Sequence, residues 1–156
     1  MTIAARVQHY LDDCGIDYEI LEHARTMTSM RTAEAGHISG ERLAKAVVLK
    51  SDGGYTMAVL PASCHLRLGE VQDYLDRPVG LATEAEVGQL FVDCEFGAIP
   101  AIGRAYGLEM IVDDSLAEQP EIYFEGGDHM SLIHVNATGF QRLTADARHG
   151  RFSRHD

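Results

Sequence analysis

The sequence predicts a mixed α/β or α+β domain in which helices flank a mixed, largely antiparallel sheet. The first observation is a pair of apolar runs, residues 43–50 and 55–61, on either side of Asp52-Gly53-Gly54, because glycine turns between β-rich runs are typical of hairpins. The second is that strand-like and helix-like segments alternate irregularly, whereas a doubly wound parallel fold repeats βα units. The third is size, since 156 residues with 46% hydrophobic side chains suffice for one domain with its own core.

Apolar spacing and capping residues predict the helices. At the N-terminus, apolar side chains recur at helical spacing until Gly15 ends the pattern. Thr83 is expected to begin another helix, and Glu84 and Glu86 follow in its first turn, where the helix dipole favours acidic side chains. The segments predicted to be helical are residues 2–14, 32–35, 62–75, 83–91 and 136–143.

Strands are predicted where β-branched and aromatic residues lie between turn residues. The segments concerned are residues 18–22, 43–50, 55–61, 108–112, 121–124 and 129–135. By contrast, residues 94–103 place Gly97, Pro100 and Gly103 in an apolar stretch, a composition that is typical of a fixed loop. We expect backbone N–H groups of this loop to be free to bind a ligand.

Lys45 is conspicuous in the first strand of the hairpin. Side chains alternate along a strand, so Lys45 shares a face with Leu43, Val47 and Leu49. Because unpaired burial of a charge is costly, the ammonium must either reach the sheet edge or point into a polar cleft. Both readings remain open from the sequence.

The chain is acidic, with 24 acidic and 13 basic residues and a formal net charge of −11. This balance disfavours broad coating of nucleic acid, which depends on phosphate neutralisation by Lys and Arg, although it permits a small basic site. The basic residues cluster near the end of the sequence, at Arg148, Arg151 and Arg154. We expect a domain over residues 1–145, followed by a flexible basic tail over residues 146–156.

The three cysteines, Cys14, Cys64 and Cys94, are odd in number and far apart in sequence. Their spacing disfavours a disulfide framework and a zinc site, and it favours a reducing cytoplasm. The N-terminus becomes polar before an apolar run forms, and no run reaches the roughly 20 apolar residues of a membrane span. We therefore expect a cytoplasmic protein without a signal peptide or a membrane partner.

Common catalytic motifs do not occur in this sequence. It contains no GxGxxG, GxxxxGK[ST], HExxH or GxSxG pattern, which disfavours dinucleotide-binding, Walker-type, zincin and α/β-hydrolase chemistry. Ser63, Cys64 and His65 adjoin one another, yet neighbouring side chains of a strand or helix point in different directions. The sequence therefore indicates no convincing nucleophile.

Four positions carry a resemblance to a known family. They are Lys45 in AKAVVLK, Gly97 in EFGAIPAIG, Asp114 in IVDDS and His129 in GGDH. In their order and approximate spacing the chain resembles the YbaK and prolyl-tRNA synthetase-associated editing-domain family over nearly its whole length. Asp113 is the alternative to Asp114 in this match.

The resemblance implies a mixed sheet around a cleft and hydrolysis of the ester that joins a wrong amino acid to tRNA, here by a free-standing protein. It implies Lys45, Gly97, Asp114 and His129 as catalytic residues, with the Gly97 loop donating N–H groups to the oxyanion. It implies no metal, no cofactor and no covalent enzyme intermediate. Mischarged tRNA is the implied partner, and an aminoacyl-tRNA synthetase is a second candidate.

A pocket for a small amino-acid side chain is expected beside these residues. Its predicted walls are Met27, Met30, Val47, Ile99, Pro100 and Ala101. The family's loop commonly has glycine, three residues and then proline, whereas this chain has Ala101 at that position and its proline one residue earlier. The departure bears on the loop's shape, and hence on the preferred amino acid or on activity itself.

Two other functions remain open. The first is a binding or regulatory module that has kept the cleft but lost catalysis, which the Ala101 departure favours. The second is a hydrolase of small acyl esters or thioesters that does not use nucleic acid, which the net charge of −11 favours.

Overall fold

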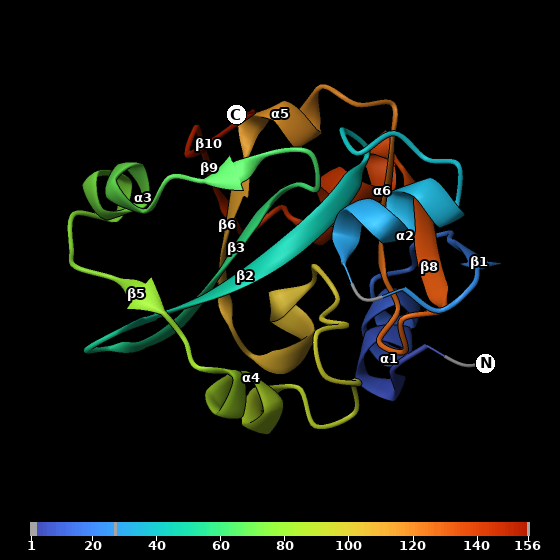
Figure 1. The fold of residues 1–156 in the computed structure, drawn as a ribbon, viewed down its shortest axis with the longest axis horizontal. Helices are drawn as coiled ribbons and strands as arrows, with labels where there is room; N and C mark the ends of the chain where they lie inside the picture. The colour runs from blue at the N-terminus through green and yellow to red at the C-terminus, as the bar shows by residue number, and fades with distance from the viewer. Residues whose placement is uncertain (1–2, 27, 156) are drawn as a thin grey trace.

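The computed structural model describes residues 3–26 and 28–155, with the exception of the Ser29 side chain. One large mixed sheet forms its centre, and helices flank that sheet (Figure 1). The helices are α1 (Ala5–Asp13), α2 (Ser29–Ala35), α3 (Leu68–Leu75), α4 (Glu84–Leu90), the 3-10 helix η1 (Gly103–Tyr106), α5 (Asp114–Ala117) and α6 (Ala137–Leu143). The strands are β1 (Glu19–Glu22), β2 (Leu43–Ser51), β3 (Gly54–Pro61), β4 (His65–Leu66), β5 (Gly80–Leu81), β6 (Glu109–Asp113), β7 (Glu121–Glu125), β8 (Ser131–Asn136), β9 (Arg148–Gly150) and β10 (Ser153–Arg154).

The main sheet has the strand order β1-β8-β7-β2-β3-β6-β9, and β5 adds to β2 outside this path. The pairs β1–β8, β7–β8, β2–β3 and β2–β5 are antiparallel, whereas β2–β7, β3–β6 and β6–β9 are parallel. A small second sheet pairs β10 with β4. The architecture confirms the predicted mixed α/β class.

The hairpin β2–β3 is the longest pairing and crosses the middle of the molecule (Figure 1). Its register runs from Ser51 opposite Gly54 to Ala44 opposite Pro61. Gly54 has φ +131°, a conformation that side chains disfavour, so glycine is required where the chain reverses. The predicted hairpin is therefore confirmed.

Strand pairing is interrupted along the edge of β2 that faces away from β3. β7 pairs with it at Leu43 and Ala44, and β5 pairs with it at Leu49 and Lys50. Within the described residues, no strand pairs with this edge at positions 45–47. A gap in a sheet leaves backbone N–H and C=O groups available, and the candidate site described below lies here.

Apolar side chains cover both faces of the sheet. On one face, Val7 and Leu11 of α1 and Phe140 of α6 share a core with Val59 and Val112 of the sheet. Burial of each such side chain contributes about 1.5–3 kcal/mol to folding, so this packing fixes the sheet that carries the site. Packing of their apolar faces, more than intrinsic helix propensity, stabilises helices of this kind.

On the opposite face, α3 packs Val71 and Leu75 against Leu49 and Ile111. Phe152 lies in the same cluster and is fully buried. No helix in the described part of the chain is long and apolar enough to cross a membrane.

The end of the chain is not the flexible tail that the sequence predicted. Arg148 and its neighbours form β9 beside β6, and β10 pairs with β4. The buried Phe152 donates its backbone N–H to Asp113 Oδ2 at 3.1 Å. Burial of Phe152 therefore holds this segment against the domain. The prediction of a tail considered only the charged residues around Phe152.

Two helix boundaries also differ from expectation. The helix predicted over residues 62–75 begins at Leu68, because His65 and Leu66 pair with β10 instead. The turn predicted at residues 32–35 is the last part of α2, whose N-cap is Thr28. The Thr28 hydroxyl accepts a hydrogen bond from Arg31 N at 3.1 Å.

Candidate active site

A cavity of about 190 Å³ opens where the β2 edge has no strand partner. The small-molecule pockets of most proteins have roughly 300–1,000 Å³, so this one suits a group no larger than a single amino acid. Residues from β2, α2, β7 and two loops line it. They are Thr28, Thr32, Leu43, Ala44, Lys45, Ala46, Gly97, Ile99, Glu125 and His129.

The backbone of Ala46 faces this gap. The carbonyl of Arg42 accepts a hydrogen bond from Tyr123 N on one side of the gap, and the carbonyl of Val48 accepts one from Ala82 N on the other. Backbone groups that face the same edge recur at every second residue of a strand. Ala46 lies between Arg42 and Val48 in this alternation, so its N–H and C=O point into the cavity.

Lys45 is half-buried and brings an ammonium to the same place. Its Nζ lies 3.5 Å from the carbonyl oxygen of Ala62. Burial lowers the pKa of Lys45 below its ordinary value of 10.5, and the nearby Cys64 opposes this shift. The sequence left open whether this ammonium reaches the sheet edge or points into a polar cleft. In the structure the two coincide, because Lys45 lines a cavity that lies at the sheet edge.

The Gly97 loop forms the opposite wall. Gly97 has φ +81°, and a Cβ added there would lie 3.4 Å from Cε1 of His129. Within the described part of the chain, the N–H groups of Gly97 and Ile99 donate no hydrogen bond. The two cavity-lining residues of this loop, Gly97 and Ile99, therefore each offer a free backbone N–H donor.

His129 is buried and has the left-handed φ of +63°. Asp128 holds this turn by accepting hydrogen bonds from Met130 N at 2.9 Å and Ser131 N at 2.7 Å. Nε2 of His129 lies 2.5 Å from the carbonyl oxygen of Phe96. Because a carbonyl only accepts, Nε2 carries the proton of the neutral ring and Nδ1 keeps a lone pair.

Glu125 supplies a carboxylate to the cavity. Its Oε1 accepts hydrogen bonds from His129 N at 3.0 Å and Gly127 N at 3.4 Å. Burial raises the pKa of Glu125 above its ordinary value of 4.5, although the hydrogen bonds from the backbone of Gly127 and His129 act against the rise. The cavity therefore contains an ammonium, an imidazole and a carboxylate from three different elements.

The structure brings together four of the residues that the sequence singled out, namely Lys45, Gly97, His129 and Ile99. Asp114 does not line the cavity, since it begins α5 at the end of β6. The alternative, Asp113, is also elsewhere: it is buried and accepts hydrogen bonds from Ser115 and Phe152. The structure therefore places Asp114 outside the cavity, and the carboxylate that lines the cavity is that of Glu125.

Most of the predicted side-chain pocket also lies elsewhere. Met30 is 44% exposed on α2, and Val47 packs beside the α3 cluster. Pro100 and Ala101 are buried behind the loop, and none of these four lines the cavity. Met27 lies outside the described residues.

Sequence reasoning missed Glu125, Thr28, Thr32 and the backbone of Ala46. The strand predicted over residues 121–124 ends one residue before Glu125, which precedes two glycines and Asp128. Thr32 is buried, and its hydroxyl lies 2.5 Å from that of Thr26. The helical periodicity of α2 gave no signal for two hydroxyl-bearing residues that face a cavity.

Fold and site together define a mixed α/β domain with a small polar cavity at an interrupted sheet edge. Residues 23–143 match the family model of the aminoacyl-tRNA editing domain, so the chain belongs to this family. None of the curated proteins matches the chain in sequence.

Solved structures share the fold over nearly the whole chain. One, reported as a proposed trans-editing enzyme for prolyl tRNA synthetase, is 24% identical with a TM-score of 0.85, and the match covers 97% of this chain and 96% of that one. The hypothetical protein APE2540 is 21% identical with a TM-score of 0.82, covering 96% and 99% of the two chains. A protein from Marinobacter aquaeolei VT8, reported as a proposed signal transduction protein, is 22% identical with a TM-score of 0.76; the match covers 95% of this chain but 30% of that one.

Proposed function

We propose that this chain is a trans-editing deacylase that hydrolyses the ester between a wrong amino acid and tRNA. The observation that carries the proposal is one small cavity lined by Lys45 and by Gly97 and Ile99, whose N–H groups donate no hydrogen bond within the described residues. Membership of the aminoacyl-tRNA editing domain family supports the substrate class. The cavity volume of about 190 Å³ supports an aminoacyl group as the part that enters.

The reaction requires stabilisation of one developing negative charge. Water adds to the ester carbonyl, the oxyanion collapses, and the ribose oxygen leaves with a proton, so that a free amino acid and an uncharged tRNA result. N–H groups of Gly97 and Ile99 are the candidate donors to the oxyanion, and Lys45 adds a positive charge from the β2 side of the same cavity. The lone pair on Nδ1 of His129, or the neighbouring 2′-hydroxyl of the tRNA, accepts the proton of the attacking water.

Recognition of the amino acid is assigned to Glu125 and the backbone of Ala46. Every aminoacyl ester carries an α-ammonium, which seeks a carboxylate and a carbonyl oxygen. Glu125 and the C=O of Ala46 offer this pair at the gap in the sheet. In this proposal Glu125 takes the place that the family resemblance gave to Asp114.

The decisive experiment measures release of amino acid from tRNAs charged with alanine, serine or cysteine. Wild type is compared with Lys45→Ala and with Lys50→Ala, a matched control because Lys50 is exposed on the same strand and pairs with Glu86. We expect selective release that Lys45→Ala slows by about 100-fold or more and Lys50→Ala leaves unchanged. Circular dichroism checks that both variants are folded.

Two outcomes would replace the proposal. Tight binding of aminoacyl-tRNA by folded wild type without release would assign the chain to the binding module. Release from small acyl esters that uncharged tRNA fails to inhibit would assign it to a hydrolase without nucleic acid, the function that the net charge of −11 favours.

A further inference from the structure

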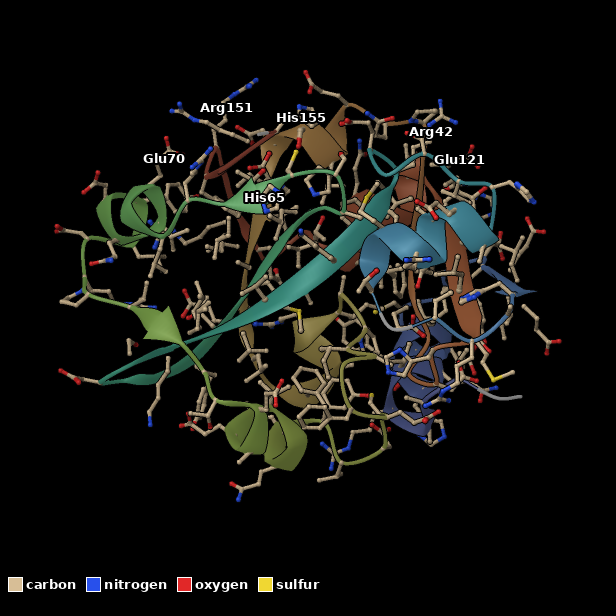
Figure 2. The ribbon with its side chains drawn as sticks, viewed as in Figure 1. Arg42, His65, Glu70, Glu121, Arg151 and His155 are labelled. Carbon is tan, nitrogen blue, oxygen red and sulfur yellow. The ribbon has the colours of Figure 1, made fainter. Side chains whose placement is uncertain are left out.

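A second cluster of reactive side chains lies outside the cavity, where the end of the chain meets the segment after β3. It comprises Glu41, Cys64 and His155, which come from three distant parts of the sequence. Figure 2 shows His155 beside the β4 segment that carries His65. None of the three lines the candidate active site.

The cluster is compact. One ligand atom from each residue, namely a carboxylate oxygen, Sγ and a ring nitrogen, lies within 4.8 Å of the other two. Nε2 of His155 lies 2.5 Å from Oε1 of Glu41. The Ser63 hydroxyl donates to the same Glu41 oxygen at 3.0 Å and lies 3.4 Å from the His155 nitrogen.

The surrounding backbone holds two of these residues in place. Ser63 N donates to the carbonyl of Gly40 at 3.3 Å, which ties the turn before Glu41 to the residue before Cys64. Cys64 is buried, whereas the side chains of Glu41 and His155 are 41% and 62% exposed. A fixed thiol thus faces two side chains that are free to rotate by the small amount that coordination needs.

We propose that Glu41, Cys64 and His155 bind a divalent transition-metal ion of the zinc class. Thiolate, imidazole and carboxylate are the three protein ligands that Zn²⁺ uses, at about 2.0–2.3 Å in tetrahedral geometry. Ligand atoms within 4.8 Å of one another converge on such an ion after small side-chain rotations. Three protein ligands leave a fourth position for water.

The charges favour this assignment over a simple ion pair. A thiolate and a carboxylate together balance the two charges of the ion, and neutral imidazole supplies the third ligand. Hydrogen bonds between Glu41, Ser63 and His155 explain two members of the cluster, whereas the buried sulfur of Cys64 takes no part in these hydrogen bonds and lies near the Lys45 ammonium. Zinc-site spacing is absent from the sequence because the fold, rather than a local motif, assembles these ligands.

The bound ion would fasten the C-terminal segment next to the active site. Cys64 N donates to the carbonyl of Pro61, and the carbonyl of Ala62 is the hydrogen-bond acceptor of Lys45. Metal at Cys64 therefore anchors the turn that contacts the catalytic ammonium, without taking part in ester hydrolysis. The role is structural, so it stands or falls separately from the proposed deacylase activity.

The test is titration of the tag-free, metal-depleted full chain with Co²⁺, a spectroscopic substitute for Zn²⁺. We expect a thiolate-to-cobalt charge-transfer band in the near ultraviolet that saturates at one equivalent and disappears when Zn²⁺ is added. Cys64→Ser should abolish the band. His155→Ala and Glu41→Gln should weaken Co²⁺ binding by about tenfold or more, because each removes one ligand.

Matched controls are Cys14→Ser, a half-buried free cysteine outside the cluster, and His9→Ala, an exposed histidine on α1. Both should keep the band and the affinity of wild type. His155 is exposed, so its variant tests the site even where Cys64→Ser does not fold. A folded wild type without a stoichiometric band, or a band that Cys14→Ser or His9→Ala removes equally, would overturn the proposal.

Discussion

Gly97 and His129 adjoin closely at the wall of the cavity. A Cβ at Gly97 would lie 3.4 Å from Cε1 of the His129 ring, and Nε2 of the same ring bonds the carbonyl of Phe96, the residue before Gly97. Both residues have positive φ, +81° for Gly97 and +63° for His129. The loop and the histidine turn therefore fix each other's position, and a change in one should disturb the other.

Substitution of Gly97 by alanine tests this dependence. The left-handed conformation costs a residue with Cβ roughly 1–2 kcal/mol, so we expect Gly97→Ala to move the loop and lower deacylation far more than it lowers stability. Gly88→Ala is the control, because Gly88 lies in α4 with open space around it and alanine favours a helix by about 0.5–1 kcal/mol. Release assays and urea unfolding measure both effects; unchanged activity in Gly97→Ala would remove the loop from the mechanism.

Glu125→Gln tests recognition of the α-ammonium. Glutamine keeps an oxygen to accept from Gly127 N and His129 N but loses the negative charge. We expect KM for aminoacyl-tRNA to rise by about tenfold, since charge-assisted hydrogen bonds contribute about 1.5–3 kcal/mol. An N-acetylated aminoacyl-tRNA lacks the ammonium and should not distinguish the variant from wild type. An equal loss with both substrates would instead indicate that Glu125 only shapes the cavity.

The same substitution should stabilise the fold at neutral pH. Burial raises the pKa of Glu125, so its stabilising contribution is complete below the ordinary value of 4.5 and is lost as pH rises through the folded pKa. Above the folded pKa the buried carboxylate is charged and opposes folding, and Gln removes that penalty. We expect a higher free energy of unfolding for Glu125→Gln than for wild type, with a difference that shrinks in acid.

Urea unfolding across the range from about pH 4 to pH 8 measures this difference. Glu118→Gln is the control, because Glu118 is exposed at the end of α5. A Glu125→Gln variant that is less stable than wild type at neutral pH would show that its hydrogen bonds outweigh its charge. A carboxylate kept at a cost in stability is typical of a functional site.

The fold was predictable where local sequence decides local structure. Asp52-Gly53-Gly54 predicted the hairpin, and Thr83 with Glu86 predicted the start of α4, where the structure has both hydrogen bonds of a capping box. The prediction of a flexible C-terminal tail was wrong. The charges of this segment suggest exposure to solvent, but one of its residues, Phe152, is buried in a core cluster. Such docking depends on partners far along the chain, which local patterns do not contain.

The site was predictable only in part, for the same reason. Lys45, Gly97 and His129 belong to recognisable local motifs, and the structure places them around one cavity. The free backbone of Ala46 arises from two strands that stop short on either side, so no residue type signals it. Glu125 faces the cavity because β7 pairs in parallel with β2, a topology that the sequence left undecided.

Asp113 and Asp114 have different surroundings, and neither of them lines the cavity. Oδ1 of Asp113 accepts from Ser115 N at 3.0 Å and Ser115 Oγ at 2.7 Å, while Oδ2 accepts from Phe152 N at 3.1 Å and Ser153 Oγ at 2.8 Å. Burial raises the pKa of Asp113, but these four hydrogen bonds outweigh it and lower the pKa overall. An amide cannot accept on both sides, so Asp113→Asn should destabilise the fold by about 2–3 kcal/mol.

Asp114→Asn should change little, because Asp114 is half-exposed and lies outside the cavity. Thermal unfolding and amino-acid release are measured on both variants at a temperature where each remains folded. We expect Asp113→Asn to lose stability but retain deacylation per folded molecule, and Asp114→Asn to retain both. If Asp114→Asn abolished release while its Tm stayed at the wild-type value, the catalytic role would return from Glu125 to Asp114, and substrate binding would have to bring α5 to the cavity.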